Sequence, residues 1–270
     1  MNLNVLVVAS ILSVNTAQST TPAAAADQNA GIPMPPFPTG FLFRTLPADS
    51  AAGIAAEMKY VVYVPRDYDP GTSWPVILFL HGRGECGHDG QKQVAQGIGT
   101  SLLWNADRWP FIVILPQKPD EQAAWEQYDD ALMRIIELAA REYRIDRDRI
   151  ALTGLSQGGH GVWALAARRP DAWSALVPIC GYARSFEPRE IAARIRHIPT
   201  WAFHGDADDV VPPQETQAIV EALRAAGGAP RLTVYPGVNH NSWDRAYADP
   251  ELPRWLLAQR RPSGAVTTQP

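Results

Sequence analysis

Short apolar runs alternate with stretches of helical character along most of this chain of 270 residues. The run 76–80 is apolar at every position, which is typical of a strand buried on both faces of a sheet. Similar runs stand at 111–115, 150–153, 175–179, 201–203 and 232–235, and two opening strands, 40–45 and 58–64, are expected to pair antiparallel. Helical character is found at 128–143, 159–169, 188–196, 213–226 and 255–260. This alternation predicts an α/β fold, an eight-stranded and mostly parallel sheet with helices on both faces.

A serine stands at the centre of a Gly-x-Ser-x-Gly pattern. Residues 154–158 read Gly-Leu-Ser-Gln-Gly, between an expected strand and an expected helix. A turn this tight strains its central residue, and the flanking glycines leave room for it. Because so short a pattern also arises by chance, its meaning depends on partners elsewhere in the chain. We expect Ser156 to present its hydroxyl as a nucleophile at the start of a helix.

A serine nucleophile needs a base and an acid, and in this kind of sheet the chain order is Ser, then Asp or Glu, then His. Of six histidines, only His240 lies in the loop after the last expected strand, so it is the expected general base. The loop after strand 201–203 offers Asp206, Asp208 and Asp209. Asp208 is the preferred acid, Asp206 the second choice and Asp209 the third, and the alternative role for the others is loop capping. A calcium site is a poor alternative because the spacing and the distal Glu of an EF-hand are missing.

The loop after the strand 76–80 reads His-Gly-Arg-Gly-Glu-Cys-Gly over 81–87. An oxyanion needs two N–H donors, and we expect them from Gln157, which follows the nucleophile, and from Arg83 in this loop. His81 and His204 each precede a glycine at a strand end. We expect these two histidines to fix their loops rather than to take part in chemistry.

The same loop contains Gly-x-Gly-x-x-Gly at 82–87, the pattern of a dinucleotide site. Such a site needs a helix that begins directly there and an acid at the end of the next strand. Instead, His-Asp-Gly continues the loop at 88–90, and the next strand runs into Pro-Gln-Lys at 116–118. The sequence therefore indicates no nucleotide, no other cofactor and no metal.

Nine tryptophans are present, and large aromatic side chains most often pack in cores. Trp125, which follows the fourth strand, is the best candidate for lining a substrate cleft. Trp163 and Trp243 are expected to brace the serine helix and the histidine loop.

The start of the chain is typical of a signal peptide, which would direct the protein to the periplasm or outside the cell. A short apolar run at 5–14 is followed by Ala-Ala-Ala at 24–26, with Ala17 as another cleavage site, although no Lys or Arg precedes the run. The alternative is a disordered or wrongly assigned start. We expect a signal peptide at 1–26, a linker at 27–39, one catalytic domain at 40–261 and a flexible tail at 262–270. An exported protein could pair Cys86 with Cys180, and the alternative is two free thiols.

Together these motifs resemble the α/β-hydrolase superfamily. Within it, they are most similar to the bacterial esterase and predicted-peptidase group related to polyhydroxybutyrate depolymerases, phospholipase/carboxylesterases and the catalytic domains of prolyl oligopeptidases. The matching segments are 80–85, 154–159, 204–212 and 237–240, and the resemblance spans about 40–260. In that group the acid falls four residues after the His of the His-Gly pair, which implies Asp208. The second oxyanion donor follows the other His-Gly pair, which supports Arg83.

The resemblance implies a serine hydrolase that forms an acyl-enzyme. Only a short helix fits between 180 and 199, so we expect no cap domain and an open cleft, suited to short acyl esters or to esters displayed on a polymer. A serine peptidase or amidase is the alternative, and a non-catalytic binding protein on the same scaffold is a third hypothesis. The net charge of -4 favours neither nucleic acid nor an anionic membrane as a partner.

Overall fold

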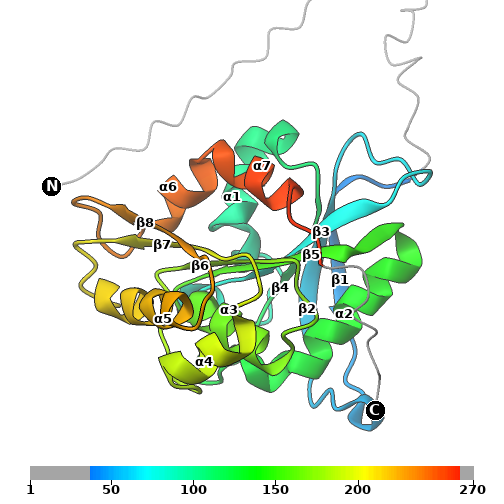
Figure 1. Cartoon of the computed structure of the whole chain (residues 1–270). Helices are drawn as coiled ribbons and strands as arrows, with labels where there is room; N and C mark the ends of the chain where they lie inside the picture. Colours follow the sequence, from blue (N-terminus) through cyan, green and yellow to red (C-terminus); the bar gives the residue numbers. More distant parts are fainter. Residues whose placement is uncertain (1–36, 262–270) are drawn as a thin grey trace, which may run out of the picture. The chain divides into compact units, whose positions relative to one another are not determined.

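The computed structural model describes residues 37–261. The expected signal peptide, most of the expected linker and the expected tail lie outside the described residues. Within this range, eight strands form one sheet in the order β1-β2-β4-β3-β5-β6-β7-β8 (Figure 1). The strands are β1 Gly40–Leu46, β2 Met58–Val64, β3 Trp74–Leu80, β4 Ile112–Pro116, β5 Ile145–Leu155, β6 Ala175–Ile179, β7 Trp201–Gly205 and β8 Arg231–Tyr235.

The sheet is mostly parallel, as the sequence predicts. β2 pairs antiparallel with β1 and with β4, whereas the strands from β4 through β3 to β8 all pair parallel. The carboxyl ends of β3, β5, β7 and β8 consequently meet at one edge of the sheet, where ligand sites form in open α/β sheets. The four motif segments, 80–85, 154–159, 204–212 and 237–240, begin at or just after these strand ends.

The described range has seven α-helices, of which α6 and α7 follow the last strand. They are α1 Ile98–Asn105, α2 Asp129–Glu142, α3 Gln157–Arg168, α4 Pro188–Ile195, α5 Pro213–Ala225, α6 Trp243–Ala248 and α7 Glu251–Leu257. The helices α2 to α5 confirm the predictions to within a few residues. The sequence did not indicate α1 or α6, and α7 begins and ends earlier than the expected helix at 255–260. None of the helices within residues 37–261 is long and apolar enough to cross a bilayer.

The helices cover both faces of the sheet (Figure 1). Alternate residues of β3 point to opposite faces, so that Val76, Leu78 and Leu80 join a core with α2, α3, α4 and α5. Ile77 and Phe79 join a second core with α1, α6 and α7. An apolar residue is therefore needed at every position of this strand, which explains its continuous apolar run.

The segment between β6 and β7 leaves the site edge uncapped. Its one helix is α4, which packs against α3 and α5. Among residues 37–261 this segment therefore forms no cap domain, in agreement with the expectation from its length.

Candidate active site

Ser156 occupies the predicted tight turn between β5 and α3. Its backbone has φ 54° and ψ −117°, a conformation that L-residues rarely adopt and that costs on the order of 1–3 kcal/mol. The turn is held because the Ser156 N–H donates to the Ile179 carbonyl at 2.9 Å. A Cβ on Gly158 would lie only 2.0 Å from the Leu80 carbonyl oxygen, and a Cβ on Gly154 only 2.6 Å from that of Gly158. Glycine is therefore required on both sides of the serine.

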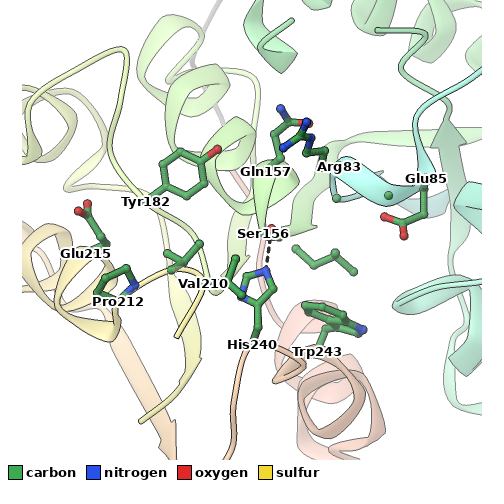
Figure 2. Close-up of a pocket in the computed structure, with 14 residues that line it drawn as sticks. Arg83, Glu85, Ser156, Gln157, Tyr182, Val210, Pro212, Glu215, His240 and Trp243 are labelled. Carbon is green, nitrogen blue, oxygen red and sulfur yellow. Dashed lines mark hydrogen bonds between the residues drawn. The ribbon is translucent and has the colours of Figure 1, made fainter. Parts of the chain in front are cut away.

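The structure brings Ser156, His240 and Asp208 together in one hydrogen-bonded chain. His240 Nε2 lies 2.9 Å from Ser156 Oγ, and His240 Nδ1 lies 2.8 Å from one oxygen of Asp208 and 3.0 Å from the other. Because a carboxylate only accepts, Nδ1 carries the proton and Nε2 is free to accept from the serine hydroxyl. Figure 2 shows His240 between Ser156 and Trp243. This is the arrangement of a nucleophile, a general base and an orienting acid.

Asp208 is held as a carboxylate although it is buried. Burial alone would raise the pKa of Asp208, but hydrogen bonds from His240 and from the N–H groups of Val211 and Val210 outweigh it and lower that pKa. The two N–H groups lie 2.9 and 3.0 Å from Oδ1. Asp206 instead accepts from the Gly237 N–H at 2.6 Å, which is the capping role considered for it, and Asp209 is exposed.

Gln157 and Arg83 lie on the opposite side of Ser156 from His240 (Figure 2). Gln157 is the first residue of α3, and Arg83 begins the 3₁₀ helix η2 Arg83–Glu85. Both residues line the same pocket as Ser156. That their backbone N–H groups hold an oxyanion stays a prediction.

His81 fixes the loop that carries Arg83, as the sequence predicts. Its Nε2 accepts from the Lys118 N–H at 2.9 Å, so its Nδ1 donates to the Gly82 carbonyl at 2.6 Å. Burial lowers the pKa of His81 to about 3, so the ring is neutral near pH 7. Lys118 is also fully buried, and its ammonium donates to the carbonyls of Asp120 and Ala123.

A pocket of about 580 Å³ surrounds Ser156. Its walls are largely apolar, and polar groups stand near the serine and at the rim (Figure 2). The lining residues are Gly82, Arg83, Gly84, Glu85, Leu155, Ser156, Gln157, Tyr182, Val210, Val211, Pro212, Glu215, His240 and Trp243. A pocket of this size, with apolar walls and a few polar groups, is typical of small-molecule sites.

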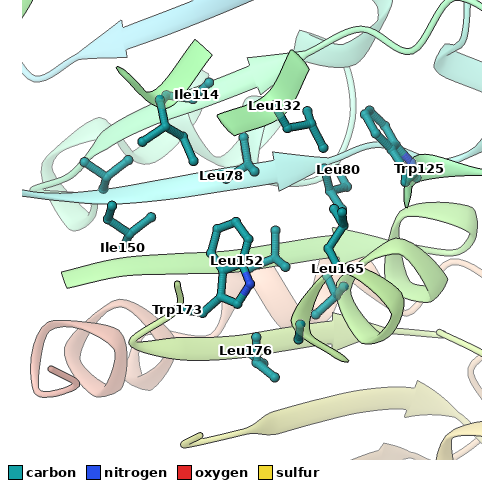
Figure 3. Close-up of a cluster of buried hydrophobic side chains, with 14 of the residues drawn as sticks. Leu78, Leu80, Ile114, Trp125, Leu132, Ile150, Leu152, Leu165, Trp173 and Leu176 are labelled. Carbon is teal, nitrogen blue, oxygen red and sulfur yellow. The ribbon is translucent and has the colours of Figure 1, made fainter. Parts of the chain in front are cut away.

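The prediction that Trp125 lines the cleft is wrong. Trp125 is fully buried on the 3₁₀ helix η5 Trp125–Tyr128 and packs in the core beside Leu80 (Figure 3). Its indole N–H donates to the His81 carbonyl at 3.1 Å, and its ring meets that of His81 edge-on, with centroids 4.8 Å apart. The segment turns inward here, because Gly161 of α3 leaves room for the indole. Trp125 therefore supports the loop that carries Arg83 through its contacts with His81.

Tyr182 and Trp243 are the aromatic residues that line the pocket. Trp243 also packs edge-on against His240, with ring centroids 5.4 Å apart, so it braces the histidine loop as expected. Tyr182 was not predicted, and the available signal was its place three residues after the end of β6, whose carboxyl end lies at the site edge.

Cys86 and Cys180 are both free. Within residues 37–261, the one group of ligand-type atoms that gathers closely is Cys180, Asp208 and His240, within 4.8 Å of one another. Since His240 and Asp208 are already hydrogen-bonded to each other, this arrangement fits a catalytic triad better than a metal site.

Comparison with known proteins agrees with this geometry. Residues 114–249 match the model of the dienelactone hydrolase family. The structure of a thermostable esterase has a TM-score of 0.70 and 32% identity, over 82% of this chain and 63% of that one. Two curated relatives are a bifunctional acetylxylan esterase/xylanase of Neocallimastix patriciarum, 26% identical over 60% of this chain, and feruloyl esterase B of Neurospora crassa, 25% identical over 62%.

The chain spans 23% of the length of the first relative and 68% of the second. The family match, in contrast, covers half of this chain and includes Ser156, Asp208 and His240. The chain therefore belongs to the dienelactone hydrolase family, within the α/β-hydrolase superfamily that its motifs predict.

Proposed function

We propose that this protein is a serine carboxylic-ester hydrolase that works through an acyl-enzyme. The observation that carries the proposal is the chain of hydrogen bonds from Asp208 through His240 to Ser156 Oγ, which ends in the pocket. A serine hydroxyl is a weak nucleophile until an adjacent base takes its proton. His240 Nε2, at 2.9 Å, is within reach of that proton.

In the proposed reaction, Ser156 Oγ attacks the ester carbonyl while its proton moves to His240 Nε2. The ionised Asp208 stabilises the imidazolium that forms and keeps the ring oriented. The N–H groups of Gln157 and Arg83 would hold the oxyanion of the tetrahedral intermediate, and each such donor is typically worth roughly 2.7–4 kcal/mol. His240 then protonates the leaving alcohol, and water cleaves the acyl-enzyme by the same steps.

Short acyl esters, free or displayed on a polymer, are the proposed substrates. The pocket volume of about 580 Å³ and its apolar walls suit a small acyl group. The uncapped site edge leaves the alcohol side open to solvent, where a polymer chain would fit. The names of the two relatives, an acetylxylan esterase and a feruloyl esterase, support esters of this kind. Action outside the cell or in the periplasm would follow from the signal peptide predicted at 1–26.

The test is the variant Ser156→Ala. We expect it to lose hydrolysis of p-nitrophenyl acetate and labelling by a fluorophosphonate, because no other group can form the acyl-enzyme. Circular dichroism should show an unchanged fold. The control is Ser73→Ala, at an exposed serine, which should keep both activities. Undiminished turnover in Ser156→Ala would refute the proposal, and turnover of peptide anilides without turnover of esters would favour a peptidase.

A further inference from the structure

A second histidine contacts the triad acid. His204 lies on β7, four residues before Asp208, and is fully buried. Its Nε2 lies 3.1 Å from Asp208 Oδ2 and 2.9 Å from the Val211 carbonyl oxygen. Its other ring nitrogen, Nδ1, lies 2.8 Å from the hydroxyl of Thr216 on α5. That hydroxyl is also 2.8 Å from the Gly181 carbonyl oxygen.

These contacts determine which nitrogen of His204 carries the proton. The carboxylate of Asp208 and the carbonyl of Val211 only accept, so Nε2 must be the donor. Burial lowers the pKa of His204, so the ring is neutral and Nδ1 has a lone pair. The Thr216 hydroxyl has one proton for two acceptors, the Gly181 carbonyl oxygen and Nδ1, and donation to Nδ1 is the direction that matches a proton on Nε2. In that direction, Thr216 favours the tautomer in which Nε2–H faces the Val211 carbonyl and Asp208 Oδ2, at 2.9 and 3.1 Å.

We infer that His204 is a positioning residue for ester hydrolysis, which donates from Nε2 to Asp208 and sets both the orientation and the basicity of this acid. The inference rests on the proposed function of Asp208. The carboxylate accepts from Val210 and Val211 on Oδ1 and from His240 on both oxygens, and its Oδ2 lies 3.1 Å from His204 Nε2. With this set of donors, the carboxylate has one position in which it faces His240.

The donor at His204 also affects how readily His240 takes up a proton. The titratable groups that act on His204 are Asp208 and His240, and the buried thiol of Cys180 lies beside both. A hydrogen bond from His204 draws charge away from the Asp208 carboxylate. Without that bond, the carboxylate stabilises the His240 imidazolium more strongly, so His240 is protonated up to a higher pH. The free base would then be lost earlier as the pH falls.

The experiment measures the rate of fluorophosphonate labelling of Ser156 from about pH 5 to about pH 9, the range in which histidine titrates. His204→Leu removes the donor, His204→Gln keeps an N–H group, and Thr216→Val removes the hydroxyl on the other ring nitrogen. In His204→Leu, we expect the acid limb of the profile to move up by about half a pH unit and the plateau rate to fall about tenfold. His204→Gln should lie closer to the wild type, and Thr216→Val should shift the limb in the same direction by less.

An acid limb that stays in place in His204→Leu, with only thermal stability reduced, would overturn the inference, because a merely structural residue would behave in this way. If His204→Leu does not fold, the acid limbs of His204→Gln and Thr216→Val are compared with that of the wild type. Unshifted acid limbs in both variants would overturn the inference. The labelling reaction uses no ester. A wild-type protein that is labelled at Ser156 but hydrolyses no ester would therefore refute the proposed function alone.

Discussion

The two sides of Ser156 are built in different ways. On the base side, the Asp208 side chain is fully buried, His240 is 18% exposed, and each hydrogen bond that orients them is made by or to a side chain. On the oxyanion side, the side chains of Arg83 and Glu121 form an ion pair but are 63% and 52% exposed. In the proposed mechanism, the chemistry of the base side therefore depends on which side chains are present, whereas that of the predicted oxyanion side depends on where the backbone lies.

The loop that carries Arg83 is fixed by buried residues beneath it rather than by its own exposed side chains. His81 accepts from the Lys118 N–H, and Trp125 packs under His81. Lys118 holds the segment that contains Glu121, whose carbonyl accepts from the Gln157 side chain at 2.9 Å. Buried groups well below the pocket thus position both predicted N–H donors.

The largest effect should come from the base side, with Asp208→Asn. The amide keeps the shape of the carboxylate, but its NH₂ group cannot accept from His240 Nδ1–H, so the ring is held in the wrong tautomer or loses its partner. We expect kcat on p-nitrophenyl acetate to fall by about 10³–10⁴-fold. The matched control is Asp206→Asn, which keeps an oxygen for the Gly237 N–H and should stay near the wild-type rate. Equal losses in the two variants would contradict the comparison.

The sequence indicated that Asp208 and His240 lie near Ser156, because these residues follow strand ends, and the structure brings the three together. Asp208 and His240 come shortly after β7 and β8, whose parallel pairing fixes where their loops begin. Side-chain direction was not predictable in this way. Trp125 stands near the right edge but turns into the core, because Gly161 opens space there. The contact of His204 with Asp208 depends on the loop after β7, which folds back so that the Val211 carbonyl oxygen lies 2.9 Å from His204 Nε2. The spacing of these residues in the sequence does not indicate such a fold.

The prediction of strands and helices has the same limit, because it too depends on signals that are local in the sequence. The central strands are buried on both faces and leave a continuous apolar run, whereas β1 and β8 are only partly buried, and all eight strands were predicted. The first part of β5 is instead polar, and ion pairs such as Arg149 with Asp146 at 3.0 Å cover it, so the strand is longer than its apolar run. The short helix α1 has no capping side chain at its N-cap, Gly97, and contains Gly99, which lowers helix propensity. Its packing against the sheet stabilises it, and no local signal predicts that packing.

Two substitutions of Arg83 should separate the role of its backbone N–H from that of its side chain, with a smaller loss of kcat than in Asp208→Asn. Arg83 is the first residue of η2, where proline fits, and Gly82 before it is extended, as a residue before proline should be. Arg83→Pro would therefore remove the N–H with little distortion, and we expect kcat to fall roughly 10²–10³-fold. Arg83→Ala removes only the exposed ion pair and should change kcat/KM by less than about twofold. If Arg83→Pro keeps the wild-type kcat, the second donor lies elsewhere.

The last substitution, Lys118→Met, should cause a smaller loss of kcat than Asp208→Asn or Arg83→Pro. It tests the buried residues that position the two predicted N–H donors. Methionine is close to lysine in size, so packing is kept, while the carbonyls of Asp120 and Ala123 lose their donor. Replacing a buried charge by an apolar group removes a desolvation cost, which can offset the loss. Burial lowers the pKa of Lys118, which indicates that its ammonium carries such a desolvation cost. Since two acceptors are left unpaired, we expect a net loss of about 1–3 kcal/mol in the free energy of unfolding.

Urea denaturation of Lys118→Met would measure this loss, with Lys92→Met as the control. Lys92 forms an exposed ion pair with Asp89 at 3.7 Å, so its removal should change the free energy of unfolding by less than about 1 kcal/mol. Because the Lys118 segment reaches Gln157 through the Glu121 carbonyl, kcat should fall together with stability in Lys118→Met. In Asp208→Asn, kcat should fall far more than stability does. If Lys118→Met loses stability at an unchanged kcat, the buried lysine supports the fold without positioning the predicted oxyanion donors. The position of these donors would then depend on the backbone turn at Gly82.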